Sequence, residues 1–514
     1  MATVSLNSAQ GKWIMVSAIL ASAMAFIDAT ALNVVLPALQ KDLDASGTDL
    51  FWILNAYLLI LASLILIGGA MGDRYGRKKV FMLGILVFIL GSAACGFAGN
   101  VTFLVICRGV QGIGGALMIP GSLSLISSGI DEKERGRAIG TWSAFTTVVT
   151  MGGPILGGAL ADAGLWRYIF FINIPFGVIT LLMLLTNVKE SEEKADRGQL
   201  DFAGAITIAL ALALLTFGFL RIPALGMQNL QSSGALAVGL ILLLLFIRIE
   251  YKYENPMMPL SLFRNAVFSG ANLLTFFLYA GLGAGMLFLS LNLVQVQGYS
   301  QLQSGLTFLP FTLLMISCAR FAGKLADRYG PRWFLIAGPA VAGCGMLLLS
   351  FVKETSGPAD YWTSFFPGIL VLGAGMSFTV APLTTAVMGA VDEQLSGTAS
   401  GINNAMTRIA SVFANAIFGA LAVLFFTGLL QKQIVSLPLS RQQKSAIVNE
   451  AKNLGDAKVP ESVDAGIRPK IEQANKLGFI YAYSMIMKIS GALALTGSLM
   501  AAVFIQKGKP VKSQ

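Results

Sequence analysis

Two charged residues lie deep inside apolar stretches near the start of the chain. Asp28 falls within the apolar run 13–38, about 15 Å from the end of that run at roughly 1.5 Å per residue. An ionised carboxylate at the centre of a bilayer costs about 2.5–3.5 kcal/mol, so such an acid is expected to be functional, paired or protonated. Because the chain has no histidine, a carried proton has to sit on a carboxyl group. We predict that Asp28 carries protons; the alternative is a structural acid in a permanent ion pair.

Arg108 is the predicted partner of that acid. It lies in the apolar run 102–128, about 10 Å from its end and at a depth comparable to that of Asp28. An opposite charge favours the ionised carboxylate, and breaking the pair would favour proton uptake. If the two helices are neighbours, we expect a switchable ion pair that couples protonation to conformation. A fixed structural bridge is the alternative.

The composition indicates that these runs cross a membrane. Hydrophobic residues make up 55% of the 514 residues and charged residues 12%, whereas soluble domains carry about 25% charged residues. Apolar runs of about 20 residues are long enough to span a bilayer as helices. We predict an all-α integral membrane protein with fourteen spanning helices, near residues 13–38, 50–71, 79–98, 102–128, 136–161, 167–187, 200–220, 233–250, 267–296, 301–324, 333–352, 362–389, 396–430 and 478–505.

Lysine and arginine gather on alternate turns, such as 74–79 and 133–137, that share a side with both chain ends. Cytoplasmic loops of membrane proteins carry this excess of positive charge, so both termini are predicted to be cytoplasmic. The same topology accounts for the net charge of +10 without a nucleic-acid partner. The chain is therefore predicted to be a multi-pass protein of the cell membrane.

A ten-residue turn occurs twice, as Gly69–Lys78 and as Gly323–Arg332. Such repeats are typical of secondary transporters built from two similar helical bundles. The aspartates of the turns are expected to cap a helix or to pair with an arginine across the interface, which would close the cytoplasmic side; a topogenic anchor is the alternative. The predicted gating residues are Gly69, Asp73, Arg74, Gly76 and Arg77 in the first turn and Gly323, Asp327, Arg328 and Gly330 in the second.

The repeated turns also define the predicted domains. If each turn follows the second helix of a six-helix bundle, the bundles occupy residues 1–190 and 261–514. Residues 191–260 then contain a linker and an inserted pair of helices. Residues 431–477 form a polar excursion with apolar positions at helical spacing, for which we predict a helical loop outside the bilayer. A plain tether and a role in gating, lipid contact or partner contact remain open.

Glycines and a proline interrupt the predicted helix 136–161. Gly153, Pro154, Gly157 and Gly158 would allow close contact with neighbouring helices and a bend in the helix. Glycine and proline are common in membrane helices, so these residues alone are a weak motif. Their position in the fifth predicted span is what makes the motif informative.

Amide, aromatic and cationic side chains within the spans are candidates for substrate contact. Amides need partners in a dry environment, so the asparagines are better candidates than the aromatic residues, most of which are expected to pack or to anchor the helices. Arg408 and Lys488, near mid-depth, are expected to face a cavity or a partner. The candidate substrate residues are Phe26, Asn33, Trp52, Asn55, Tyr57, Asn272, Phe276, Tyr279, Asn292, Asn403, Asn404 and Arg408.

Taken together, these motifs resemble those of the major facilitator superfamily, and more narrowly its fourteen-span drug:proton antiporters, over residues 13–505. The repeated turns match the signature loop of that family. The stretch Leu104–Ala116, with Arg108, Gln111 and Gly112, resembles the helix 4 motif tied to proton coupling. The stretch Gly153–Gly158 resembles the antiporter motif of helix 5, and Asp28–Pro37 is similar to the helix 1 signature of the fourteen-span branch.

The resemblance implies a major-facilitator fold and proton-coupled efflux of amphipathic small molecules by alternating access. Its partners would be a small-molecule substrate, protons and the lipid bilayer, with no enzymatic activity, cofactor or metal. In quaternary-ammonium pumps helix 13 carries carboxylates, but here Gly397–Arg408 has none, which disfavours dicationic drugs. In the helix 5 motif Val149 replaces the usual glycine. The alternatives are a dedicated exporter or flippase of one metabolite or lipid, and a transport-inactive sensor or structural protein; an accessory protein could bind 431–477.

Overall fold

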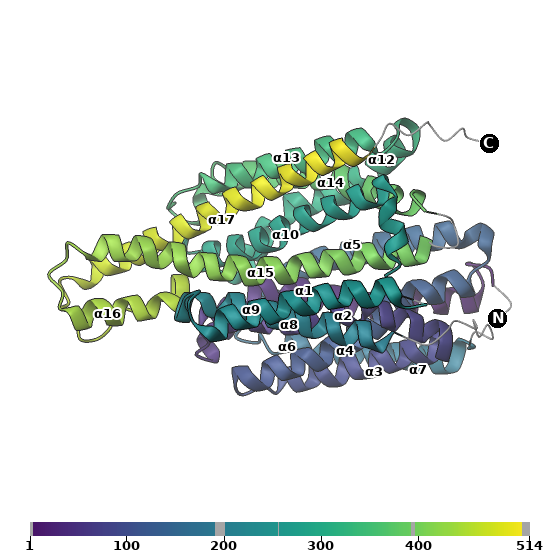
Figure 1. The fold of residues 1–514 in the computed structure, drawn as a ribbon, viewed down its shortest axis with the longest axis horizontal. Helices are drawn as coiled ribbons and strands as arrows, with labels where there is room; N and C mark the ends of the chain where they lie inside the picture. The colour runs from purple at the N-terminus through teal and green to yellow at the C-terminus, as the bar shows by residue number, and fades with distance from the viewer. Residues whose placement is uncertain (1–3, 191–200, 255, 257, 392–395, 506–514) are drawn as a thin grey trace.

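The computed structural model describes residues 4–190, 201–254, 256, 258–391 and 396–505. Within these ranges every secondary-structure element of three or more residues is a helix. Most of the helices run along one long axis (Figure 1). The α-helices are α1 Ala9–Asp42, α2 Gly47–Tyr75, α3 Arg77–Gly96, α4 Val101–Gly129, α5 Glu132–Asp162, α6 Tyr168–Phe171, α7 Asn173–Asn187, α8 Phe202–Leu225, α9 Leu230–Lys252, α10 Ala266–Gln295, α11 Gln301–Thr307, α12 Leu309–Tyr329, α13 Arg332–Ser350, α14 Phe365–Gly389, α15 Ser396–Ile434, α16 Arg441–Glu450 and α17 Arg468–Phe504, and the 3-10 segments are η1 Leu260–Arg264, η2 Pro358–Asp360 and η4 Ala451–Asp456.

The predicted all-helical membrane fold is confirmed, and each predicted apolar run lies on one helix or on two consecutive ones. Among the described residues, twelve helices are long and apolar enough to cross a membrane. The runs 136–161 and 301–324 are helical as α5 and as α11 followed by α12, but they are not among those twelve. Pro310 lies in the first turn of α12, where its missing N–H leaves no helical hydrogen bond unmade. The count of fourteen spans remains a prediction.

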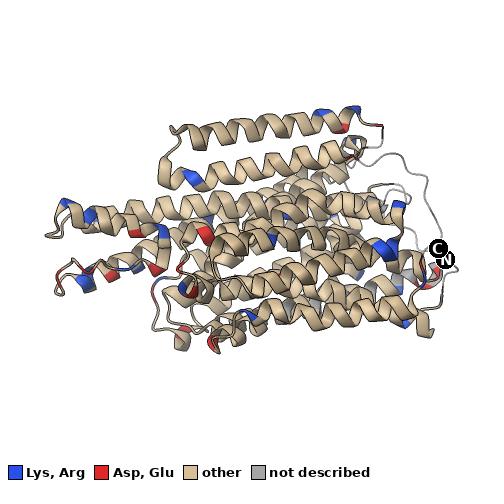
Figure 2. Ribbon diagram, turned by 90° about the horizontal axis from the view of Figure 1, so that it is seen from below, with Lys and Arg blue, Asp and Glu red and all other residues tan. Residues whose placement is uncertain are grey.

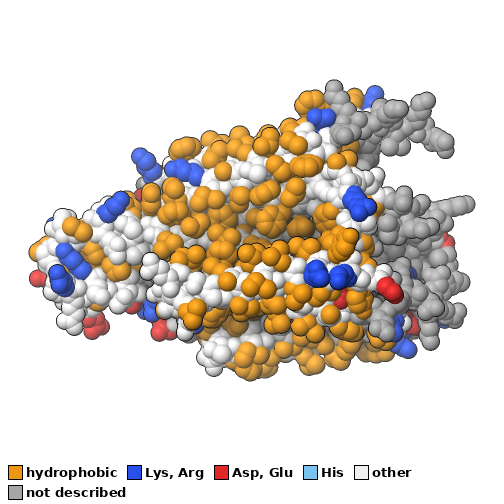
Figure 3. All heavy atoms as spheres, viewed as in Figure 1, with side chains coloured by type: hydrophobic (Ala, Val, Ile, Leu, Met, Phe, Trp, Pro, Cys, Tyr) orange, Lys and Arg blue, Asp and Glu red, His pale blue; other side chains and the backbone are white. Residues whose placement is uncertain are grey.

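The surface of the helices is that of a multi-pass membrane protein. Apolar side chains cover the middle of the face shown in Figure 3. Lysine, arginine, aspartate and glutamate gather toward the two ends of the helices (Figure 2). Large side chains such as Leu90 and Ile106 are about as exposed as surface polar residues, at 60% and 61%. An exposed apolar surface of this extent is favourable in contact with lipid and unfavourable in contact with water.

Helix α1 begins and helix α17 ends at the same end of the bundle (Figure 1). We call this the inner end and the opposite end, from which α16 projects, the outer end, following the predicted orientation. One group of helices, α1 to α7, packs together, and α10 to α17 form a second group. Helices α8 and α9 pack on each other, and α8 contacts α2 of the first group and α15 of the second. The domain boundaries 1–190, 191–260 and 261–514 remain a prediction, since the linker residues 191–200 lie outside the described residues.

The outer excursion is a folded helical structure. Helix α15 extends to Ile434, α16 follows, and α17 begins at Arg468. The η4 turn is docked on the outer end of the bundle, because the side chain of Gln40 in α1 donates to the carbonyl of Asn453 at 3.3 Å. Gln295 of α10 donates in turn to the side chain of Gln40 at 2.9 Å. The η4 turn therefore contacts both groups of helices.

Leu454→Asp is expected to release η4 from the bundle. The Leu454 side chain is 1% exposed, and placing a carboxylate there costs at least about 2 kcal/mol, which corresponds to roughly 30-fold more of the undocked form. Trypsin cleavage after Lys452 and Lys458 should accelerate by about that factor. Val435→Asp is the matched control, because Val435 is 69% exposed. Equal cleavage rates in the two variants would show that η4 is not held by Leu454.

Candidate functional site

Asp28 and Arg108 form a buried ion pair between α1 and α4. The Arg108 Nη1 atom donates to Asp28 Oδ2 at 2.5 Å, and the two side chains are 1% and 0% exposed. Gln111, one turn further along α4, donates from Nε2 to Asp28 Oδ1 at 2.9 Å. Its carbonyl oxygen accepts from the same Nη1 atom at 2.7 Å. Both oxygens of Asp28 are therefore satisfied by α4.

The guanidinium of Arg108 is also held from α2. Its central carbon lies 4.4 Å from the centroid of the Tyr57 ring, which is the geometry of a cation–π contact. Glycines in α4 make this approach possible: a Cβ on Gly112 would come within 2.8 Å of the Tyr57 carbonyl, and one on Gly115 within 3.1 Å of the Tyr57 hydroxyl. The helix packing that buries Asp28 thus depends on small residues opposite Tyr57.

Gln111 belongs to the helix 4 motif that the sequence analysis identified, but it was not predicted as a proton-coupling residue. Residues three apart share a helix face, so its spacing from Arg108 was an available signal. The amide donates to Asp28 and accepts from Arg108, so it bridges the two charges. Removing one member of a buried ion pair typically costs about 3–5 kcal/mol because the other charge is left unpaired. A proton on Asp28 would remove that charge and loosen its hold on Arg108.

The glycines of α5 pack this helix against α1, next to Asp28. A Cβ on Gly153 would collide with the Thr30 hydroxyl, and one on Gly157 would lie 2.7 Å from the carbonyl of Ala31. The Thr30 hydroxyl donates to the carbonyl of Thr150 in α5 at 2.9 Å. These contacts link the backbone two residues beyond Asp28 directly to α5.

The opposite face of α5 packs against α11 of the second group. A Cβ on Gly158 would collide with the carbonyl of Gln301, and one on Gly305 would collide with the carbonyl of Pro154. Beyond them, Asp162 accepts hydrogen bonds from the Ser300 hydroxyl at 2.6 Å and from the backbone N–H of Gln301 at 2.8 Å. The two groups of helices therefore meet closely at the outer end.

The repeated turns have the same backbone geometry. Gly76 and Gly330 follow α2 and α12 with positive φ angles of 106° and 84°, a region that favours glycine. Arg74 lies over the ring of Tyr75 at 5.6 Å, and Arg328 lies over the ring of the equivalent tyrosine at 5.3 Å. This similarity agrees with the duplicated sequence.

The gating roles predicted for these turns cannot be placed on their aspartates. The side chains of Asp73 and Asp327 lie outside the described part of the chain. In the first turn Glu190 accepts hydrogen bonds from the backbone N–H groups of Lys78 and Lys79, at 3.0 Å each, and so caps α3. The gating roles of the residues in both turns stay predictions.

The candidate substrate residues do not form one cluster. Asn403 of α15 donates to the side chains of Asn272 at 3.1 Å and Thr275 at 2.8 Å, which ties α15 to α10. Asn404 is exposed and donates to a carbonyl of its own helix, that of Ser400. Asn55 and Asn292 are fully buried, and their amide atoms have no hydrogen-bond partner among the described residues. These last two are the amides most in need of a ligand or water.

The aromatic candidates occupy mainly packing positions. Trp52 lies 6.4 Å from the ring of Phe217 in α8, and Phe276 lies 6.4 Å from the ring of Phe413 in α15. Tyr57 belongs to the Arg108 site rather than to an open surface, since it is 1% exposed. The remaining candidates, Phe26, Asn33 and Tyr279, are half-buried on α1 and α10.

Arg408 and Lys488 have different surroundings. Arg408 is half-buried on α15 and makes no ion pair with any described residue. Lys488 is exposed, 5.9 Å from the ring of Phe351 at the outer end of α13. Its mid-depth position stays a prediction.

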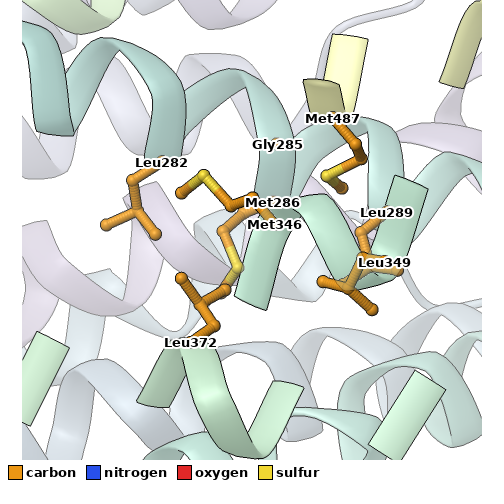
Figure 4. Close-up of a pocket in the computed structure, with 8 residues that line it drawn as sticks. All are labelled: Leu282, Gly285, Met286, Leu289, Met346, Leu349, Leu372 and Met487. Atoms are coloured by element: carbon orange, nitrogen blue, oxygen red, sulfur yellow. The ribbon is translucent and has the colours of Figure 1, made fainter. Parts of the chain in front are cut away.

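A small apolar pocket lies inside the second group of helices (Figure 4). The space between its lining side chains is too small to hold a water molecule, so it is not a ligand pocket of the usual size of roughly 300–1,000 Å³. No predicted substrate residue lines it. The lining residues are Leu282, Gly285, Met286, Leu289, Met346, Leu349, Leu372 and Met487.

The profile of the Major Facilitator Superfamily matches residues 18–415. The chain therefore belongs to the major facilitator superfamily, a family of membrane transporters, as the sequence motifs predict.

Known proteins support this assignment over nearly the whole chain. The multidrug resistance protein Stp of Mycobacterium tuberculosis is 32% identical, over 94% of this chain and 88% of the relative. The tetracenomycin C resistance and export protein of Streptomyces glaucescens is 28% identical, over 95% of this chain and 90% of the relative. The crystal structure of a bacterial homolog of the human lysosomal transporter Spinster shares the fold, with a TM-score of 0.69, 17% identity and coverage of 98% of this chain and 100% of that one.

Proposed function

We propose that the protein is a proton-coupled efflux transporter, a drug:H⁺ antiporter that exports amphipathic small molecules by alternating access. The observation that carries this proposal is the buried group of Asp28, Arg108 and Gln111, which contains a carboxyl group able to exchange charge for a proton in a dry environment. The names of the relatives, a multidrug resistance protein and an antibiotic export protein, support efflux.

Proton binding at Asp28 would release Arg108 and alter the packing of α1. The contacts of Gly153 and Gly157 with α1, and of Gly158 with α11, would carry this change to the outer contact between the two groups of helices. A membrane potential of 100 mV contributes about 2.3 kcal/mol per charge moved. One proton per cycle would therefore sustain a substrate gradient of about 50-fold, since a factor of ten corresponds to about 1.4 kcal/mol.

The proposal is tested with everted vesicles or proteoliposomes and a panel of compounds. Adding a transported compound to energised vesicles should release protons from their interior, and an uncoupler should stop uphill transport. Transport that continues unchanged after the proton gradient has collapsed would contradict proton coupling. A steady conductance without substrate would indicate a channel.

A second candidate is a dedicated exporter of one compound. The relative named for resistance to and export of tetracenomycin C favours it, because that name specifies a single antibiotic. Transport of many unrelated compounds from the panel would exclude this candidate. Lipid movement alone would indicate a flippase, and no transport by well-folded protein would indicate a sensor or structural role.

The fourteen spans, the cytoplasmic termini and the two bundles with an inserted pair are part of the same proposal. The matching geometry of the turns at Gly76 and Gly330 supports a duplicated bundle. The loop 431–477 is the surface that we propose for any accessory protein, because α16 projects beyond the other helices (Figure 1).

Arg408→Gln is expected to change the charge preference of transport. A unit charge about 8 Å away in an effective dielectric near 20 is worth about 2 kcal/mol. Removing Arg408 should therefore raise the transport of the monocation ethidium about 30-fold and lower that of the anion anilinonaphthalene sulfonate by a similar factor.

Lys488→Gln is the matched control for Arg408→Gln, since it removes the same charge from an exposed position. It should leave the ratio of ethidium to anilinonaphthalene sulfonate transport unchanged. Equal effects of the two variants would show that Arg408 does not face the transport path.

A further inference from the structure

Two buried carboxyl groups meet at the inner end of α8 and α9, outside the Asp28 site. Asp201 precedes α8 and is 3% exposed, and Glu250 lies near the end of α9 and is 2% exposed. One oxygen of each is satisfied by the backbone. Asp201 Oδ1 accepts from the N–H of Gly204 at 2.7 Å, and Glu250 Oε2 accepts from the N–H of Met258 at 2.9 Å.

The two other oxygens face each other without a donor. Asp201 Oδ2 and Glu250 Oε1 are buried and have no hydrogen-bond partner that could donate among the described residues. Both lie beside Gly204, where an added Cβ would touch the two carboxyl groups. That Cβ would collide with Asp201 Oδ2 and lie 3.0 Å from Glu250 Oε1, so the two free oxygens are close neighbours. Two carboxylates this close cannot both be ionised at low cost, and a hydrogen bond between them requires a proton.

Among the described residues, no cation forms an ion pair with either carboxyl group. The charged residues closest along α9 are Arg248, Lys252 and Glu254, which are all exposed, as is Arg264 on η1. The contact of α8 and α9 with α2 and α15 is apolar, formed by Leu59, Ala62, Ile208, Leu212, Phe246 and Val412. Of the other charged residues on these elements, Arg221 is at the outer end of α8, Arg74 at the inner end of α2 and Arg408 further along α15.

We propose that Asp201 and Glu250 are a second proton-binding site, which holds one proton between the two carboxyl groups and thereby fastens the inserted helices to the chain that leads into α10. Asp201 caps α8, Glu250 belongs to α9, and Met258 lies on the segment before η1 and α10. With the proton bound, α8, α9 and the segment that contains Met258 are joined by hydrogen bonds. Without it, two negative charges face each other and the junction weakens. The inserted helices also contact α2 and α15, so this site adjusts their packing to the pH at the inner end.

A metal ion fits the pair poorly. Magnesium and calcium take six or more oxygen ligands, whereas this site offers two free carboxyl oxygens. No group of three or more acidic, histidine or cysteine side chains in the described part of the chain is arranged to hold a metal. A proton satisfies both free oxygens at once.

The test is infrared spectroscopy of the purified full-length protein. The carbonyl stretch of a protonated carboxylic acid should be present at neutral pH, and Glu250→Gln and Asp201→Asn should each remove the contribution of one such group per chain. Asp28→Asn identifies any contribution from the other buried acid. Glu254→Gln is the matched control, because Glu254 is exposed on the same stretch of chain. An unchanged band in both pair variants overturns the proposal.

Thermal unfolding provides an independent measurement with its own sign. The bound proton stabilises the folded protein, so the unfolding temperature of the unaltered protein should fall as pH rises through the titration of the pair. In Glu250→Gln the amide donates permanently to Asp201, so this fall should be lost. A pH dependence identical in both proteins, or stabilisation by Mg²⁺ or Na⁺ in place of protons, overturns the proposal. Neither measurement requires transport. The proposal for Asp201 and Glu250 can therefore fail without contradicting the efflux function.

Discussion

Asp28→Asn is expected to abolish uphill export and to leave the protein folded in the membrane. The asparagine carbonyl can still accept a hydrogen bond from Arg108, whereas its NH2 group cannot accept the one from Gln111, and the side chain cannot exchange a proton for a charge. A substrate gradient of about 50-fold at 100 mV should therefore collapse to equilibration, because one proton supplies about 2.3 kcal/mol under that potential. Substrate-induced proton release from energised vesicles should disappear with it.

Asp42→Asn is the matched control for this prediction. It makes the same chemical change on the same helix, but Asp42 is 47% exposed and pairs with Arg167 at the outer end. Transport in this variant should stay within about twofold of the unaltered protein, because exposed ion pairs contribute little.

A second variant addresses the charge that Asp28→Asn leaves on Arg108. The double variant Asp28→Asn/Arg108→Gln removes both charges, so it should restore any stability lost by the single change while transport remains uncoupled. Coupled export that persists in well-expressed Asp28→Asn protein would sink the assignment of Asp28 as the proton carrier.

Gly158→Leu is expected to reduce transport at least fivefold by keeping α5 away from α11. A side chain at this position would collide with the backbone of Gln301, which cannot move as a flexible side chain can. Forcing such a contact costs about 1–3 kcal/mol, so the conformation with the outer end closed would become about 5- to 150-fold less populated. Distances between spin labels on α5 and α11 should increase, and the transport rate should fall accordingly.

Gly152→Leu is the control for the glycine prediction. Gly152 lies on the same helix, is exposed and has no atom within 4 Å of an added Cβ, so the substitution should leave both distance and transport unchanged. Gly305→Leu approaches the same contact from the other group of helices and should reproduce the loss, because its side chain would meet the carbonyl of Pro154. Normal transport in both Gly158→Leu and Gly305→Leu would show that the contact is not part of the cycle.

Much of the architecture was predictable from hydropathy, since an apolar run long enough to cross a bilayer has to satisfy its backbone internally and therefore forms a helix. The predicted depth of Asp28 and Arg108 in the membrane was counted along the same apolar runs.

Asp201 and Glu250 illustrate what the sequence did not reveal. Each lies at the edge of an apolar run, where an acid is expected to be hydrated, and they are 49 positions apart along the chain. Only the packing of α8 on α9 buries them against each other. Asn403 shows the same limit, since its partners on α10 could not be known from its place on α15.

The amino-acid sequence by itself determined that the chain crosses a membrane as helices, that a charged turn occurs twice, and which acid is buried deepest, because these properties can be read along the chain. The tertiary structure alone decided that Asp28 is held by Gln111 as well as Arg108, that α5 is wedged between α1 and α11, and that two carboxyl groups share one buried corner. Such pairings depend on which helix faces meet, and helices of similar hydrophobicity can pack in many ways until their small residues and close contacts select one.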